Sequence, residues 1–221
     1  MDPEEKFERA RSEMVQTQLF ERGIRSPRVL AAMGEVPRHL FVPERVRHLS
    51  YSDGPLAIGE NQTISQPYVV GLMTELLSLE GEEKILEIGT GSGYQAAVLA
   101  RLANQVFTVE QYQVLADRAR EILRRAGVEN VSVFVGDGSA GLPEYAPYDA
   151  VVITAAAPEI PRSLLEQLAD GGRLVLPVGG KRGQQLQLIR RSGNRFSRKK
   201  LVPVAFVPLR GRYGWSEDDW G

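Results

Sequence analysis

Three carboxylates lie where parallel strands would end, and their positions point to ligand binding. Glu87 ends an apolar run and precedes a glycine-rich turn, Glu110 ends the next apolar run, and Asp137 follows a third between two glycines. In open α/β sheets, ligands bind beyond the carboxyl ends of the strands. Acids at three successive strand ends therefore indicate one shared ligand.

The glycine-rich turn narrows the kind of ligand. Residues 84–94 read Lys-Ile-Leu-Glu-Ile-Gly-Thr-Gly-Ser-Gly-Tyr, an apolar strand followed by glycine at every other position. A dinucleotide fingerprint is G-x-G-x-x-G, whereas this turn is G-x-G-x-G. Glu87 would repel a pyrophosphate at the helix N-terminus. It suits S-adenosylmethionine, which has an ammonium, a sulfonium and no phosphate; the alternative is a tight turn that binds nothing.

Two further acids suggest how the rest of such a cofactor is held. Glu110 follows the glycine turn by about twenty residues, a spacing at which a carboxylate accepts ribose hydroxyls; otherwise it is a solvated acid at a helix N-terminus. Asp137 can accept the exocyclic amine of adenine, and the alternative is an ordinary Asp-Gly turn. The predicted cofactor-binding residues are Glu87, Gly89, Thr90, Gly91, Gly93, Glu110, Asp137 and Gly138.

Other chemistries find little support in the sequence. The chain has no cysteine, which removes disulfides, thiolate nucleophiles and cysteine-based zinc sites. His39 and His48 lack metal-ligand spacing, so we expect no metal. No G-x-S-x-G occurs, and Ser92 belongs to the glycine turn, so a hydrolase nucleophile is not indicated.

Length, charge and termini predict one soluble domain. The chain has 221 residues and a net charge of -1, which indicates neither nucleic acid nor an anionic membrane as a partner. The acidic N-terminus does not resemble a secretory signal, and no apolar run approaches the roughly 20 residues of a membrane span. We therefore expect a cytoplasmic protein.

Alternating strands and helices from Lys84 onward predict a doubly wound, mostly parallel α/β sheet covered on both faces. The predicted strands are Lys84–Ile88, Gln105–Val109, Val131–Val135, Tyr148–Thr154 and Arg173–Val178, then two late β segments, Gln184–Arg190 and Leu201–Leu209. The helices between them are predicted at 95–102, 112–126 and 161–168. Because no helix separates the two late segments, they should pair antiparallel at one edge.

A helical extension precedes this core. Helices are predicted over 4–22, from Ser26-Pro27 to residue 33, and over 67–78, with residues 36–43 extended or turning. Residues 51–67 have no predicted regular structure, and a loop that long is usually either functional or disordered. Disorder would expose Tyr51, Ile58 and Ile64, so we expect a functional loop. We divide the single domain into residues 1–80 (extension and substrate loop), 81–210 (cofactor-binding core) and 211–221 (tail). We expect the acidic end of the tail, residues 216–221, to be frayed except at its tryptophans.

The chain closely resembles the bacterial and archaeal protein-L-isoaspartate O-methyltransferases, nearly end to end. The segments that carry the resemblance are 14–19, 22–24, 36–39, 41–43, 62–67, 86–94, 136–138, 146–149 and 177–179. Many methyltransferases share the glycine turn, but Gln-Thr-Ile-Ser-Gln-Pro at 62–67 is specific and decides the substrate class. One departure is Asn61, where the family pattern has glycine.

The resemblance implies a Rossmann-like enzyme that methylates the free α-carboxylate of L-isoaspartyl residues in damaged proteins and peptides. S-adenosylmethionine would become S-adenosylhomocysteine. The methyl ester is a better leaving group than the free acid, so a succinimide can close and reopen to aspartate. The carboxylate, with a pKa of about 4, is already ionised at pH 7 and needs alignment rather than a base. Ser65 is the predicted catalytic residue, donating a hydrogen bond that holds this carboxylate.

The resemblance also implies a peptide site. Its predicted substrate-binding residues are Ile58, Thr63, Ile64, Ser65, Val207 and Pro208. Backbone groups near Val207 and Pro208 could pair with an extended peptide, a mode that accepts many sequences. The expected partners are isoaspartyl proteins and peptides, and the expected state is a monomer.

Three other functions stay open from the residues. A small-molecule O-methyltransferase of the same fold differs only in residues 51–67. A non-catalytic cofactor-binding module is disfavoured by acids at all three strand ends. A nicotinamide-dependent oxidoreductase is disfavoured by Glu87 and by the glycine spacing. A cofactor titration would separate the methyltransferases from the oxidoreductase, but not from one another or from an inert binder.

Overall fold

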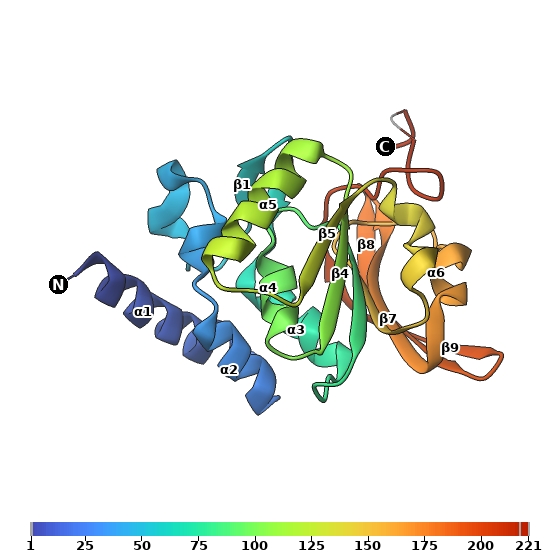
Figure 1. The fold of residues 1–221 in the computed structure, drawn as a ribbon, viewed down its shortest axis with the longest axis horizontal. Helices are drawn as coiled ribbons and strands as arrows, with labels where there is room; N and C mark the ends of the chain where they lie inside the picture. The colour runs from blue at the N-terminus through green and yellow to red at the C-terminus, as the bar shows by residue number, and fades with distance from the viewer. Residues whose placement is uncertain (1, 217, 221) are drawn as a thin grey trace.

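The computed structural model describes residues 2–216 and 218–220, which form a seven-stranded sheet flanked by helices (Figure 1). The strand order is β5-β4-β3-β6-β7-β8-β9. The strands are β3 (Lys84–Ile88), β4 (Gln105–Glu110), β5 (Val131–Val135), β6 (Tyr148–Ile153), β7 (Leu168–Gly180), β8 (Gly183–Ser192) and β9 (Arg195–Val204). β3 to β7 pair in parallel, and β8 and β9 are antiparallel. The predicted mostly parallel sheet with an antiparallel edge is confirmed.

Apolar side chains on both faces explain why these strands are buried. In β3, Ile85 joins one hydrophobic core and Leu86 joins the core on the opposite face. The first core packs against α3 (Pro67–Leu77), α4 (Tyr94–Ala100) and α5 (Gln113–Arg125), and the second against α6 (Arg162–Glu166). A parallel strand covered on both faces is expected to be a continuous apolar run, and Glu87 interrupts this one.

The N-terminal extension is helical, as predicted, but its geometry differs from a single α-helix. α1 (Pro3–Glu13) continues as a π-helical stretch, Met14–Phe20, within the predicted helix. α2 (Pro27–Glu35) begins where predicted, because Ser26 caps its first turn. The segment expected to be extended contains a 3₁₀ turn, Arg38–Phe41, and a second follows at Glu44–Leu49. The N-terminal helices (blue) lie at the end of the molecule away from β9 (Figure 1).

The stretch 51–67 is not irregular throughout, which corrects the sequence prediction. It contains an antiparallel hairpin of β1 (Leu56–Gly59) and β2 (Gln62–Ile64). Its two turn residues, Glu60 and Asn61, have φ of 50° and 55°. A two-residue turn with both φ values positive is the type I′ hairpin turn, which prefers glycine or asparagine. Asn61 can therefore occupy the position where the resembling family has glycine.

The late β segments are longer and earlier than predicted. β7 begins at Leu168, five residues before the predicted start at Arg173, and α6 ends correspondingly sooner. β9 ends at Val204, so residues 205–209 lie outside the sheet's last strand. Four basic residues lie on this edge strand: Arg195, Arg198, Lys199 and Lys200. Charged side chains on an edge strand oppose pairing with another sheet.

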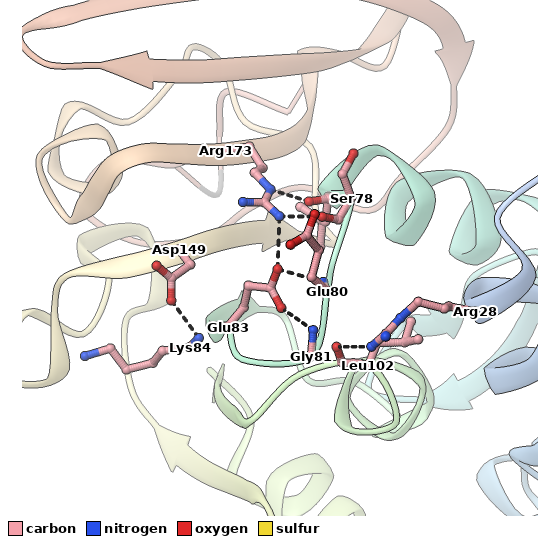
Figure 2. Close-up of polar contacts among 10 residues, drawn as sticks. Arg28, Ser78, Glu80, Gly81, Glu83, Lys84, Leu102, Asp149 and Arg173 are labelled. Atoms are coloured by element: carbon pink, nitrogen blue, oxygen red, sulfur yellow. Dashed lines mark hydrogen bonds and ion pairs between the residues drawn. The ribbon is translucent and has the colours of Figure 1, made fainter.

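A polar cluster joins the amino end of β3 and Arg173 of β7 to the end of α3 (Figure 2). Glu83 accepts hydrogen bonds from the backbone N–H groups of Glu80 and Gly81, both at 2.8 Å, and pairs with Arg173 at 3.2 Å. Arg173 also donates to the carbonyls of Leu77 and Ser78. The cluster lies at the edge of the sheet opposite the strands' carboxyl ends, so its role is structural.

We expect Glu83→Ala to lower the free energy of unfolding by about 3 kcal/mol, because Arg173 would lose the carboxylate with which it pairs in a largely buried position. Burial alone would raise the pKa of Glu83, but the backbone N–H groups and Arg173 outweigh it and hold the pKa below 4.5. The resulting stabilisation is present above pH 4.5 and is lost as the pH falls through the folded-state pKa. Urea unfolding at several pH values measures both effects.

The matched control is Glu82→Ala, since Glu82 is exposed and adjacent in sequence. It should unfold like the wild type at every pH. Equal stabilities for Glu83→Ala and Glu82→Ala would contradict the structural role of the cluster.

The described residues contain neither a membrane-spanning helix nor a metal-binding cluster. None of the helices in 2–216 and 218–220 combines the length and apolarity of a transmembrane span. The same residues contain no group of three or more His, Asp or Glu side chains arranged to hold a metal ion.

Candidate active site

A cavity of about 270 Å³ lies beyond the carboxyl ends of β3, β4 and β6. The chain order of the sheet reverses between β3 and β6, which is where open α/β sheets bind ligands. Its walls come from the β1–β2 hairpin, the glycine turn after β3, the end of β4 and residues 207–210. We call it the cofactor cavity.

The glycine turn brings backbone to the wall of this cavity. Gly89 and Gly91 line it and have φ of 96° and 53°. A Cβ at Gly89 would lie 2.4 Å from the hydroxyl of Thr154, which donates a 2.6 Å hydrogen bond to the Gly89 carbonyl. Gly93 instead faces α5, where its Cβ would contact Ala119 at 3.3 Å. Gly89 and Gly91 therefore expose backbone to a ligand, and Gly93 permits helix packing.

Glu110 lines the cavity and organises the turn at the same time. One carboxylate oxygen accepts from the Gly91 N–H at 2.8 Å, and the other accepts from the Tyr112 N–H at 3.0 Å. The residue is only 5% exposed. Each oxygen retains acceptor capacity, so this carboxylate suits the hydroxyl groups of a ribose.

Glu87 and Thr90 lie beneath the turn and do not line the cavity. Thr90 and Thr108 share a hydrogen bond of 2.7 Å, and the Thr108 hydroxyl donates to Glu87 at 2.6 Å. Glu87 is fully buried, and its Oε1 has no hydrogen-bond partner in the described part of the chain. Burial raises the pKa of Glu87 to about 8. The side chain therefore supports the turn from inside the fold.

We expect Glu87→Gln to flatten the pH dependence of stability in the absence of cofactor. Because the folded-state pKa is raised, the folded protein retains a proton that the unfolded chain releases above pH 4.5. The wild type should therefore lose stability as the pH rises from 4.5 towards 8. Glutamine has no such proton. Thermal unfolding across this range tests the difference, and parallel pH profiles for the two proteins would refute it.

Asp137 lies next to the cavity but does not line it. Its Oδ1 accepts from the backbone N–H and the hydroxyl of Ser139, at 2.9 and 2.6 Å. Its Oδ2 accepts from the Arg212 N–H at 2.7 Å. Gly138 does line the cavity, and a Cβ there would lie 2.6 Å from Ile88. The structure thus brings the glycine, rather than the carboxylate, to the wall.

A second cavity, of about 480 Å³, adjoins the first, and we call it the acceptor cavity. The two cavities share three lining residues, Thr63, Thr154 and Val207. Ser65 lines the acceptor cavity, and its hydroxyl makes no hydrogen bond to residues 2–216 or 218–220. That hydroxyl is thus available to a ligand.

The other predicted substrate residues divide between cavity and core. Ile58 and Ile64 are buried in the hydrophobic core and line neither cavity; Ile58 borders a separate groove beside α5. Pro208 lines the cofactor cavity. The Val207 carbonyl already accepts from the Ala156 N–H at 2.8 Å. Pairing between a peptide and this segment would have to use its other backbone groups.

Thr154 and Arg38 are not among the residues predicted for the site. Thr154 ends an apolar strand with a polar side chain, which is the same signal that identifies the three acids. Arg38 is fully buried and donates to the carbonyls of Ser50 and Ser65, at 2.7 and 2.8 Å. Its burial lowers its pKa to about 10. A buried arginine has no signature in a single sequence, because arginines are usually exposed.

The cavity fits an adenosine-like cofactor without phosphate. Ile88, Val109 and Leu209 offer apolar walls, glycine backbone permits close approach, and Glu110 offers acceptors for hydroxyl groups. Together with the parallel sheet and its glycine turn, these features define the class: a Rossmann-like, S-adenosylmethionine-dependent methyltransferase.

Comparison with known proteins narrows this class. Residues 9–214 match the family Protein-L-isoaspartate(D-aspartate) O-methyltransferase (PCMT). The chain is 56% identical over 205 residues to a protein-L-isoaspartate O-methyltransferase of Methanoregula boonei, covering 93% of this chain and 94% of that relative. A solved protein-L-isoaspartate O-methyltransferase has a TM-score of 0.85 and 30% identity, covering 92% of this chain and 67% of the other. A Plasmodium falciparum protein described as a β-aspartate methyltransferase, solved with S-adenosyl-L-homocysteine, has a TM-score of 0.79 and 24% identity, covering 90% and 98%.

The chain belongs to the PCMT family. The predicted resemblance, fold class and S-adenosylmethionine dependence are thereby confirmed, as is the predicted activity of a protein carboxyl methyltransferase acting in isoaspartate repair. The roles of individual site residues remain predictions.

Proposed function

We propose that this enzyme methylates the free α-carboxylate of L-isoaspartyl residues at the junction of its two cavities. S-adenosylmethionine, when bound, supplies an electrophilic methyl group: a carboxylate oxygen bonds to the methyl carbon as the sulfur–methyl bond breaks, and sulfur keeps the electron pair. The ester product then allows succinimide closure and repair.

The observation that carries this proposal is the shared wall of the two cavities. Thr63, Thr154 and Val207 line both, so ligands in the two cavities would meet beside these residues. The cofactor cavity carries Glu110 and the acceptor cavity carries Ser65. This arrangement supports direct transfer between two bound molecules.

Ser65 is the residue that aligns the acceptor. An isoaspartyl carboxylate is ionised at pH 7, so no general base is required. The Ser65 hydroxyl donates one hydrogen bond that fixes the direction of this carboxylate. This bond is one part of the alignment of the two reactants, which as a whole can lower a barrier by about 7 kcal/mol or more. The Arg38 guanidinium donates a 2.8 Å hydrogen bond to the Ser65 carbonyl. This bond limits movement of the backbone that carries the Ser65 hydroxyl.

The cofactor residues fall into two roles. Gly89, Gly91, Gly138 and Glu110 contact the cofactor directly, which their position on the cavity wall supports. Glu87, Thr90 and Gly93 hold the glycine turn in shape from below and from the α5 side.

The enzyme acts on isoaspartyl proteins and peptides as a monomer in the cytoplasm. The absence of cysteine from the sequence is compatible with a reducing compartment. Light scattering of the purified protein tests the monomeric state, and fractionation of the source cell tests the location.

The deciding experiment is transfer of labelled methyl to a matched peptide pair, one with L-isoaspartate and the other with aspartate at the same position. We expect base-labile methyl ester on the isoaspartyl peptide alone. Transfer to neither peptide by a protein that binds S-adenosylhomocysteine would overturn the substrate assignment and leave the cofactor site standing. Equal transfer to both would remove the role of the acceptor cavity in selecting isoaspartate.

A further inference from the structure

The C-terminal segment, residues 209–216 and 218–220, closes over one side of the cofactor cavity. Trp220, next to last in the sequence, lines the cavity together with Glu110 and Tyr112. It does not line the acceptor cavity. Trp220 is therefore not part of the shared wall of Thr63, Thr154 and Val207, beside which methyl transfer is proposed to take place.

Asp137 and Ser139 anchor the first part of this segment. The Arg212 N–H donates to Asp137 at 2.7 Å, and the Tyr213 N–H donates to the Ser139 hydroxyl at 2.9 Å. Gly211 packs so closely that a Cβ there would lie 1.9 Å from the Asp137 carboxylate. The Asp137 carboxylate thus accepts a hydrogen bond from a segment 75 residues later in the chain.

Two further contacts hold the second part. The Trp215 indole donates to the Ala156 carbonyl at 3.0 Å, and its backbone N–H donates to the Leu209 carbonyl at 2.8 Å. The Arg210 guanidinium donates to the carbonyls of Trp215 and Ser216. The ring of Trp220 then packs edge-on against Trp215, with centroids 5.4 Å apart. These contacts orient the indole of Trp220 at the cavity.

We propose that Trp220 is a cofactor-binding residue that covers the nucleoside part of S-adenosylmethionine, and that Asp137 positions it through the C-terminal segment. An indole offers a flat apolar face to adenine and attracts a nearby cationic centre through its π system. This inference rests on the proposed cofactor site. It gives Asp137 a role that does not require its carboxylate to touch the cofactor.

The test uses S-adenosylhomocysteine, the unreactive product, measured by calorimetry and by tryptophan fluorescence. The chain has only two tryptophans, both in this segment, so Trp215→Phe leaves Trp220 as the sole indole. We expect S-adenosylhomocysteine to change the emission of Trp215→Phe. We expect Trp220→Ala to weaken binding by about 10-fold or more, the usual loss when an aromatic ring that stacks on a base is removed. Trp220→Phe should restore most of the affinity.

Tyr213→Ala is the matched control, because Tyr213 is an aromatic residue of the same segment that does not line the cofactor cavity. It should bind S-adenosylhomocysteine like the wild type. If Trp220→Ala bound S-adenosylhomocysteine with wild-type affinity, and this ligand did not change the emission of Trp215→Phe, the role of Trp220 would be overturned. The proposed cofactor site would be unaffected by that result. Failure of the wild type to bind S-adenosylhomocysteine would overturn the proposed cofactor site as well.

A double-mutant cycle separates the two possible roles of Asp137. If Asp137 acts through the segment, Asp137→Asn should weaken binding in the wild type and have little further effect in Trp220→Ala. If the carboxylate contacts the cofactor itself, Asp137→Asn should weaken S-adenosylhomocysteine binding by the same factor in the wild type and in Trp220→Ala. The second result would overturn the positioning role.

Discussion

Ser65→Ala should lower kcat for the isoaspartyl peptide by about 10- to 100-fold, the loss expected when a hydrogen bond to a charged group is removed. The affinity for S-adenosylhomocysteine should stay within about twofold of the wild type, because Ser65 lines the acceptor cavity and not the cofactor cavity. The measurements are steady-state methyl transfer and calorimetric titration of the product.

Two variants sharpen this prediction. Ser65→Thr keeps a hydroxyl and should retain more activity than Ser65→Ala. Ser52→Ala removes an exposed serine on the same stretch of chain, and we expect it to have wild-type kcat. If S-adenosylhomocysteine affinity fell in Ser65→Ala as far as kcat did, Ser65 would belong to the cofactor site and the alignment role would be lost.

Glu110→Ala should have the largest effect on cofactor affinity, raising the Kd for S-adenosylhomocysteine by about 100-fold. The carboxylate accepts hydrogen bonds from Gly91 and Tyr112 while lining the cavity. Its removal takes away acceptors for the ribose and leaves two backbone donors unpaired in a buried place, each hydrogen bond to a charged group being worth about 1.5–3 kcal/mol.

The control for Glu110→Ala is Glu121→Ala, on the exposed face of α5 and outside the cofactor cavity. Its Kd should equal that of the wild type. Thermal unfolding without ligand separates loss of binding from loss of folding. A folded Glu110→Ala protein that binds S-adenosylhomocysteine with unchanged Kd would exclude Glu110 from cofactor binding.

Features that depend on neighbours in the chain could be predicted from the sequence. β3 and β5 have the predicted bounds, because short apolar runs bounded by turn residues favour strands. Ser26 caps α2 as expected, since capping needs only the first turn of the helix. The glycine-rich turn also follows β3 as its sequence indicates, and its glycines Gly89, Gly91 and Gly93 have positive φ.

Features that depend on distant contacts could not be predicted in this way. The hairpin at 56–64 was missed because its turn residues, Glu60 and Asn61, lack the Asn-Gly pattern that marks a type I′ turn. β9 begins at Arg195, six residues before the predicted start at Leu201, because pairing with β8 makes an edge strand of residues that are mostly charged and polar.

The amino-acid sequence by itself determined the family, the cofactor class and the order of strands and helices, because these follow from local patterns and from specific motifs such as residues 62–67. Only the tertiary structure decided which predicted residues reach a ligand. Glu87 and Asp137 both follow apolar runs, yet the fold buries one beneath the glycine turn and binds the other to Arg212. The direction of a carboxylate depends on groups that packing brings to it, and for Asp137 one of those groups lies 75 residues later in the chain.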